Sequence, residues 1–106
     1  MNMTRLSNRA AVEAARELIA NPKTWTRFHL ARNASSRMVN PRSPEAVRWC
    51  AEGACIRSQV WAEDIDRLEG EALQHGPGLA VTNDRPGGRK KVLAIFDAVL
   101  EEDAKR

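Results

Sequence analysis

The most restrictive feature of the sequence is a stretch near its middle, residues 44–61, that is apolar around most of a helical circumference. One side of its helical wheel carries Val47, Cys50, Ala51, Ala54 and Trp61, and another carries Trp49, Gly53, Ile56 and Val60. A helix that is apolar over so wide an arc must be surrounded by other elements. We therefore expect a helix from about residue 44 at the centre of the fold, with Ser43 as N-cap and Pro44 in the first turn.

Three further segments have the amphipathic period of helices that cover such a centre. They span residues 7–20, 62–75 and about 89–103, each with apolar side chains on one face. Gly76-Pro77-Gly78 ends the helix over residues 62–75, and residues 79–88 are expected to form a loop. No proline separates the second helix from the third, so one continuous helix is an alternative. Gly53 weakens a helix, and its presence predicts the close approach of a neighbouring backbone.

Residues 24–40 lose the helical period and contain residues that favour strands and turns. We expect a small β-hairpin or an ordered loop there, lying on the helices. The predicted fold is thus mainly α: a compact bundle of about four helices around the second helix, which begins at about residue 44. A small β-hairpin is expected between this helix and the first helix, which spans residues 7–20. One domain over residues 1–106 is the natural count for this length. The predicted core is Leu18, Val47, Trp49, Ala54, Ile56, Ile95, Phe96 and Val99.

Composition and charge limit the class of protein. The longest strongly apolar run is residues 92–96, too short to cross a membrane, and the start of the chain lacks a signal-peptide pattern, so we expect a cytoplasmic protein. Cys50 and Cys55 point about 140° apart on a helix, which predicts structural thiols and no metal site. The net charge is +3, with balances of +6 in residues 1–43, −4 in 44–75 and +1 in 76–106. A basic front of this kind can face an anionic partner or complement the acidic middle.

A cluster of basic residues precedes the last helix, where the sequence reads "NDRPGGRKKVLAIFD". Arg85, Arg89, Lys90 and Lys91 oppose the helix dipole, and an anion docked on the free N–H groups would reverse that effect. The spacing does not match the nucleotide-binding loop. These four residues are candidates for binding a partner or an anion, beside the simpler interpretation of a solvated loop.

Arg57 and Asp84 are candidates for a structural ion pair. Arg57 lies within the apolar arc of the helix expected from about residue 44, and a buried arginine needs a carboxylate or several carbonyl groups. Asp84, in a turn with Asn83, is the expected partner. No arrangement of residues matches a known catalytic signature, no catalytic residue is predicted, and His29 lacks a partner that would make it a base. An enzyme with a site near Arg57, Asp84 or His29 is the weakest alternative, and no cofactor is expected.

Three short motifs, "RWCAEGA" (48–54), "TND" (82–84) and "VLAIFDAVL" (92–100), together resemble a family of small, uncharacterised bacterial and phage proteins known as a domain of unknown function. That family similarly combines a Trp-Cys-x-x-Gly-Ala helix, an Asn-Asp turn and a Val-Leu-Ala helix. Where the family has a Thr or Ser capping the last helix, this chain has Gly88. The resemblance implies no activity and favours an accessory protein that acts by binding.

We therefore expect a small, cytoplasmic, non-enzymatic binding or regulatory module that docks on another macromolecule, such as a phage or mobile-element accessory protein. A protein partner is the first expectation. Nucleic-acid binding through the basic N-terminal region and the 85–91 loop is the alternative, which clustering of the early basic residues on one exposed face would favour. The sequence predicts no membrane association and leaves the oligomeric state open.

Overall fold

Within residues 3–104, five helices make up most of the chain, so the expectation of a mainly α protein is confirmed. The computed structural model describes the backbone of residues 3–104 and the side chains of residues 8–104. The helices are α1 (Met3–Ala20), α2 (Ala51–Arg57), α3 (Ala62–His75), α4 (Leu79–Asp84) and α5 (Gly88–Ala104). The helices predicted over 7–20, 62–75 and 89–103 correspond to α1, α3 and α5.

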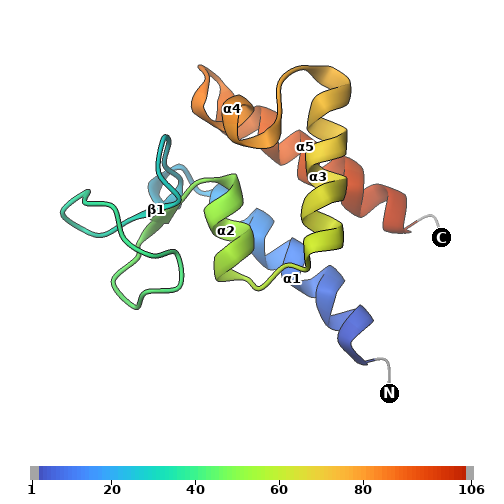
Figure 1. The fold of residues 1–106 in the computed structure, drawn as a ribbon, viewed down its shortest axis with the longest axis horizontal. Helices are drawn as coiled ribbons and strands as arrows, with labels where there is room; N and C mark the ends of the chain where they lie inside the picture. The colour runs from blue at the N-terminus through green and yellow to red at the C-terminus, as the bar shows by residue number, and fades with distance from the viewer. Residues whose placement is uncertain (1–2, 105–106) are drawn as a thin grey trace.

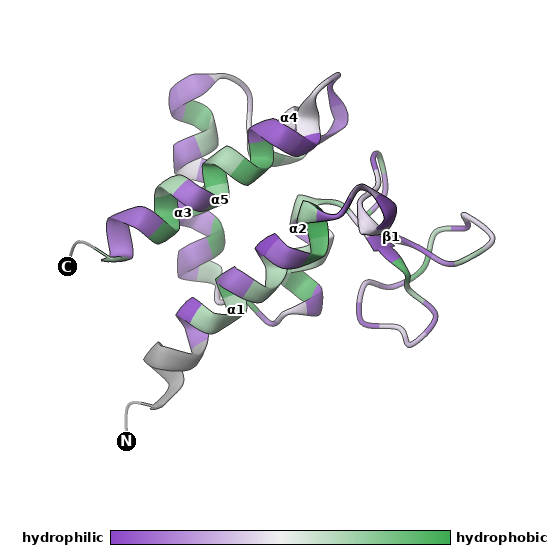
Figure 2. Ribbon diagram, turned by 180° about the vertical axis from the view of Figure 1, so that it is seen from behind, coloured by the Kyte–Doolittle hydropathy of each residue, from purple (hydrophilic) through white to green (hydrophobic). Residues whose placement is uncertain are grey.

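The helices enclose a compact core. Helix α5 lies against α1, α3 and α4, and α2 lies against α1 and α4 (Figure 1). Apolar and polar stretches alternate along α1 and α5 (Figure 2). The two helices lie in contact, and buried apolar side chains of both belong to one core cluster. Large fully buried side chains come from four helices: Ile19, Leu68, Leu79 and Phe96. Burying a side chain of this size contributes roughly 1.5–3 kcal/mol. The central position expected for α2 is therefore shared with α5.

The start predicted for the second helix, at residue 44, is wrong. Helix α2 begins at Ala51, and the Sγ of Cys50 caps it by accepting a hydrogen bond from the Gly53 N–H at 3.3 Å. The Ser43 hydroxyl accepts from the Glu45 N–H at 3.1 Å, within a turn. Ser and Pro favour turns as well as helix starts, and the residues that follow this turn enter a strand instead.

Helices α2 and α3 are separate, which excludes the single long helix. Gln59 adopts a φ of 60°, a left-handed conformation that does not continue a helix. Asn8 of α1 then accepts a hydrogen bond from the Trp61 N–H at 2.9 Å, immediately before α3. Residues 79–84, expected as loop, form α4, whose Leu79 and Asn83 are buried. So short an apolar pattern does not distinguish a helix from a loop.

A small antiparallel sheet lies between α1 and α2 in the sequence, as expected, but with different strands. Strand β1 (Ala31–Arg32) pairs with β2 (Arg48–Trp49), so that Ala31 faces Trp49. Within residues 24–40, where a hairpin was expected, the strands are replaced by a single antiparallel bridge between Arg32 and Met38. The loops around this sheet project from one side of the helices (Figure 1).

The core prediction is confirmed in part. Trp49, Ala54, Ile95, Phe96 and Val99 are buried, and Leu18 packs against the core while partly exposed. Val47 and Ile56 are 40% and 37% exposed, so their expected burial is wrong. Val47 precedes β2 instead of lying on a helix, and α2 buries the face that carries Ala51, Ala54 and Cys55.

Gly53 occupies the close contact that its position predicts. A Cβ atom there would lie 1.8 Å from the backbone oxygen of Leu30, so any larger residue would push β1 away from α2. Among residues 3–104, none of the helices has both the length and the apolar character needed to span a membrane.

Candidate functional site

Positive charge is concentrated in the loops and strands that join α1 to α2. This basic segment, residues 21–50, contains six Arg or Lys residues and a single acidic residue, Glu45. The rest of the chain is slightly acidic in total, since the protein's net charge is only +3. An excess of positive charge over a short segment can attract an anionic partner if the charges share one surface.

Asn83, in the last turn of α4, fixes the basic segment to the helices. Its Oδ1 accepts hydrogen bonds from Trp25 Nε1 at 2.8 Å and from the Ala51 N–H at 3.0 Å. Its Nδ2 donates to the Thr26 carbonyl at 3.1 Å and to Asp84 Oδ1 at 3.0 Å. A carboxamide has two accepting and two donating positions, and here all are used. The side chain is fully buried, whereas the sequence indicated only a local turn.

Asp84 holds an exposed aromatic residue in an unusual conformation. Its Oδ1 accepts a hydrogen bond from the Phe28 N–H at 2.8 Å. Phe28 has a φ of 72°, a left-handed conformation that bulky side chains rarely adopt, and it is 68% exposed. Strained residues of this kind are concentrated at binding and catalytic sites. The Asn83-Asp84 pair thus positions residues 25–28.

Arg57 is satisfied by carbonyl groups. Among the described residues, no ion pair joins it to Asp84, the partner expected from the sequence. Its Nη1 donates to the carbonyls of Pro41 at 3.2 Å and Ser43 at 2.8 Å, and its Cζ lies 5.3 Å from the centroid of the Trp49 ring. Arg57 therefore closes the 41–43 turn over Trp49, which is a structural role.

A shallow depression in the basic segment brings cations and aromatic rings together. It has a volume of about 530 Å³, and four of its lining residues are basic: Lys23, Arg27, Arg32 and Arg48. Trp25 and Phe28 also line it. We call this surface the basic depression. In the described part of the chain, none of its four cations forms an ion pair with a carboxylate.

The arginines of the basic depression are held by neutral groups. Arg32 donates to Thr26 Oγ1, the Ser36 carbonyl and the Arg27 carbonyl, which secures the surrounding loops. Arg48 donates to Ser36 Oγ at 2.6 Å. The guanidinium of Arg27 stacks 5.3 Å from the centroid of the Trp25 ring, and its buried Nε has no hydrogen-bond partner among the described residues. The positive charge is therefore fixed in place without being neutralised.

The basic residues of the N-terminal region divide into two groups. Arg9 and Arg16 lie on α1 and form ion pairs with acidic side chains. The other described members all belong to the loops and strands of the basic segment: Lys23, Arg27, Arg32, Arg37 and Arg42. The side chain of Arg5 lies outside the described residues. Most of this positive charge is thus gathered beside one small sheet.

The four basic residues predicted to bind an anion before the last helix do not form one cluster. Arg89 donates to the Ala20 carbonyl at 2.6 Å and so satisfies the end of α1, where a cation is favourable. Lys90 is exposed. Arg85 and Lys91 line a second pocket instead.

Gly88, the first residue of α5, has a steric reason to be glycine. A Cβ atom there would lie 2.2 Å from the Asn83 carbonyl oxygen and 2.5 Å from that of Thr82. The close contact between the end of α4 and the start of α5 thus leaves no room for a capping Ser or Thr.

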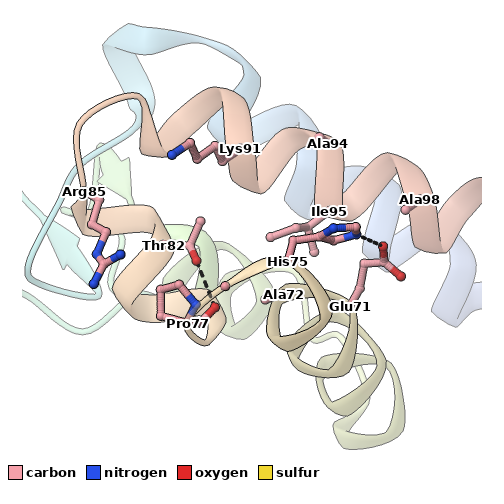
Figure 3. A pocket seen from close by; sticks show the side chains of 11 residues that line it. Glu71, Ala72, His75, Pro77, Thr82, Arg85, Lys91, Ala94, Ile95 and Ala98 are labelled. Atoms are coloured by element: carbon pink, nitrogen blue, oxygen red, sulfur yellow. Dashed lines mark hydrogen bonds and ion pairs between the residues drawn. The ribbon is translucent and has the colours of Figure 1, made fainter.

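The second pocket lies between α3, α4 and α5 and has a volume of about 570 Å³. Its walls include Ala72 and Ile95 (Figure 3). Arg85 and Lys91 lie at one end, while His75 and Glu71, with Nε2 and Oε2 3.0 Å apart, lie at the other. Since the His75 side chain is 69% exposed, this pair resembles an ordinary surface contact more than a catalytic dyad.

The remaining reactive residues give no sign of catalysis. Cys50 and Cys55 are buried and free. Burial raises the pKa of both thiols, that of Cys55 to about 12, which keeps them protonated and unreactive at neutral pH. His29 is half-buried, and its ring has no hydrogen bond among the described residues. In the same part of the chain, no group of three or more His, Cys, Asp or Glu side chains is arranged to hold a metal ion.

Comparison with protein-family models, with curated proteins and with solved structures found no match to this chain. The resemblance to a family of bacterial and phage proteins accordingly stays a prediction, and the geometry of the site carries the functional argument.

Proposed function

We propose that this protein is a non-enzymatic binding module that docks on an anionic macromolecule through the basic depression. The observation that carries the proposal is the set of four cations, Lys23, Arg27, Arg32 and Arg48, that line the basic depression and have no carboxylate partner among the described residues. Uncompensated charge on a fixed surface attracts counter-ions and speeds the association of an oppositely charged partner. The proposal keeps the cytoplasmic, accessory role that the sequence suggested.

The other residues considered for chemistry have structural contacts, which also favours binding over catalysis. Arg57 is bonded to two carbonyl groups, and Asp84 accepts from the Phe28 N–H. A general base or nucleophile must be close to a partner group in a site that a substrate can enter. A protein partner, our first expectation from the sequence, is a second candidate, because Leu30, Met38 and Val47 expose apolar side chains in the same segment.

The test is the salt dependence of binding to polyanions, with charge variants at two places. One triple variant carries Lys23→Gln, Arg27→Gln and Arg48→Gln. Its matched control carries Arg85→Gln, Lys90→Gln and Lys91→Gln, which removes the same charge from exposed positions outside the basic depression. Fluorescence anisotropy would measure the affinity for labelled heparin, a nucleic-acid pool and polyglutamate at about 50 and about 200 mM salt.

We expect the parent protein and the control to bind at least one polyanion with an affinity that falls as salt rises, and the depression variant to lose most of it. Equal losses in both variants would mean that net charge alone is responsible, and the proposal would then be wrong. A loss in the 85–91 control alone would move the binding site to that loop. Circular dichroism on both variants would check that the fold is kept.

A further inference from the structure

We propose that the anionic partner is a single-stranded nucleic acid, with a base stacked on Phe28 and the neighbouring phosphates held by Arg27, Arg48 and Lys23. This inference rests on the proposed function and specifies its partner. It is based on an aromatic ring and a set of cations that share one surface, because an unpaired strand presents both base faces and phosphates.

Phe28 is the residue that a purely electrostatic site would not need. Its side chain is 68% exposed although it is apolar, and its backbone is held at a φ of 72°. The hydrogen bond from its N–H to Asp84 offsets part of this strain. Asp84 is itself placed by Asn83, which is fully buried. The fold therefore keeps the Phe28 ring exposed although its backbone conformation is unfavourable, as expected when the ring itself is needed for binding.

Trp25, the other aromatic residue in the basic depression, already makes contacts within the protein. Its Nε1 donates to Asn83 Oδ1, and the Arg27 guanidinium covers one ring face. Among the described residues, no hydrogen bond uses the terminal N–H groups of this guanidinium. These groups suit a phosphate, since arginine binds phosphate oxygens through such groups. Phe28 is thus the ring available for a base, and Arg27 is the adjacent phosphate contact.

The same features fit the other polyanions less well. An acidic protein would be attracted by the cations, but its carboxylates gain nothing from an exposed phenyl ring. A regular duplex presents phosphates on the outside and keeps its base faces stacked within, so Phe28 could reach a base only after unstacking. A single strand uses both kinds of group at once, and base stacking of this kind tolerates any sequence.

The first experiment changes the ligand and leaves the protein intact. Anisotropy would compare binding of the parent protein to a short oligothymidylate, to an abasic strand of the same charge, to a duplex and to polyglutamate. We expect the oligothymidylate to bind more tightly than the abasic strand by between about five-fold and a hundred-fold, the range for one stacked base. Equal affinity for the two strands would overturn the inference and leave the proposed function standing.

The second experiment changes the ring. Phe28→Leu keeps an apolar side chain but removes the aromatic face, and Phe28→Trp restores a stacking surface. Met38→Leu is the matched control, since Met38 is 67% exposed in the same segment and is not aromatic. We expect Phe28→Leu to lose the preference for oligothymidylate over the abasic strand, and Phe28→Trp and Met38→Leu to keep it.

The outcomes separate the two proposals. If Phe28→Leu binds the oligothymidylate as the parent does, while Lys23→Gln, Arg27→Gln and Arg48→Gln together weaken binding, the inference is wrong and the polyanion module stands. A preference for polyglutamate over every nucleic acid would identify an acidic protein as the partner and overturn the inference. If the parent protein binds no polyanion at low salt, both proposals fail.

Discussion

The helices and the basic segment use arginine in opposite ways. In the helices, two arginines join elements through carboxylates: Arg16 of α1 pairs with Asp97 of α5, and Arg67 of α3 pairs with Asp103 of α5. The hydrogen bonds to these two aspartates are the main reason that the pKa of each arginine is raised. In the basic segment, Arg32 and Arg48 donate to carbonyl and hydroxyl oxygens instead. The charges of Arg16 and Arg67 are thus compensated within the fold, whereas those of Arg32 and Arg48 are not.

The two regions also differ in what holds their backbone. A helix satisfies most of its own N–H and C=O groups, so α3 and α5 depend mainly on burial of one face. The basic segment has only two short strands, and side chains such as those of Asn83 and Arg57 supply much of its support. Such a segment can keep strained residues like Phe28 where a partner can reach them. Four pairs of variants test this difference between the helices and the basic segment.

The largest effect is expected from replacing a buried phenylalanine. Phe96→Ala should lower the free energy of unfolding by roughly 3–5 kcal/mol, because Phe96 is fully buried on α5 and leaves a cavity. Phe28→Ala, the same change in the basic segment, should alter it by no more than about 0.5 kcal/mol, as for most exposed positions. Urea unfolding followed by circular dichroism measures both. Similar losses in the two variants would contradict the proposed division between core and exposed binding surface.

The next effect concerns the connection between the two regions. Asn83→Ala leaves Trp25 Nε1, the Ala51 N–H and the Thr26 carbonyl without this partner, and should cost about 2–4 kcal/mol. Trp25→Phe removes only one of these bonds and should cost about 1 kcal/mol. Hydrogen exchange should show that the Phe28 amide loses protection in Asn83→Ala. If the two variants lose equal stability, Asn83 does not connect the regions as described.

A third pair of variants tests the contact between β1 and α2. Gly53→Ala places a Cβ atom against the Leu30 backbone and should destabilise the protein by about 1–3 kcal/mol through overpacking. Gly70→Ala, at an exposed position of α3, has no atom within 4 Å of the new Cβ and should stabilise by about 0.5–1 kcal/mol. Thermal unfolding gives the sign of each change. A neutral Gly53→Ala would show that the sheet can move away from α2 at little cost.

The smallest stability effect distinguishes paired from unpaired arginine. Arg67→Gln removes contacts to Asp64 and Asp103 and should cost about 1 kcal/mol at low salt, and less as salt screens the charges. Arg48→Gln should leave stability within about 0.5 kcal/mol of the parent while weakening polyanion binding. Paired unfolding and anisotropy measurements check both. A large loss of stability in Arg48→Gln would mean that this charge serves the fold after all.

The sequence alone determined the parts of the fold that depend on neighbouring residues. The amphipathic period places α3 over residues 62–75 and α5 within a residue or so of its bounds, because one apolar face of a long helix is a local pattern. The position of Gly53 inside an apolar stretch likewise predicts the close backbone contact that the structure shows. The concentration of basic residues before α2 was visible as a charge balance.

The contacts of the basic and polar residues depend on parts of the chain that are far apart in the sequence. The residues around Ser43 are as typical of a helix start as of the turn that they form. Residues 48–49 form a strand because residues 31–32 lie beside them. Asn83 meets Trp25, which is 58 residues away along the chain, and Asp84 meets Phe28 at a separation of 56. Hydrogen bonds of this kind depend on which distant groups the packed helices bring within about 3 Å. A local sequence pattern does not specify the distance between groups that are far apart along the chain. The basic depression and its exposed ring can therefore be identified only in the folded structure.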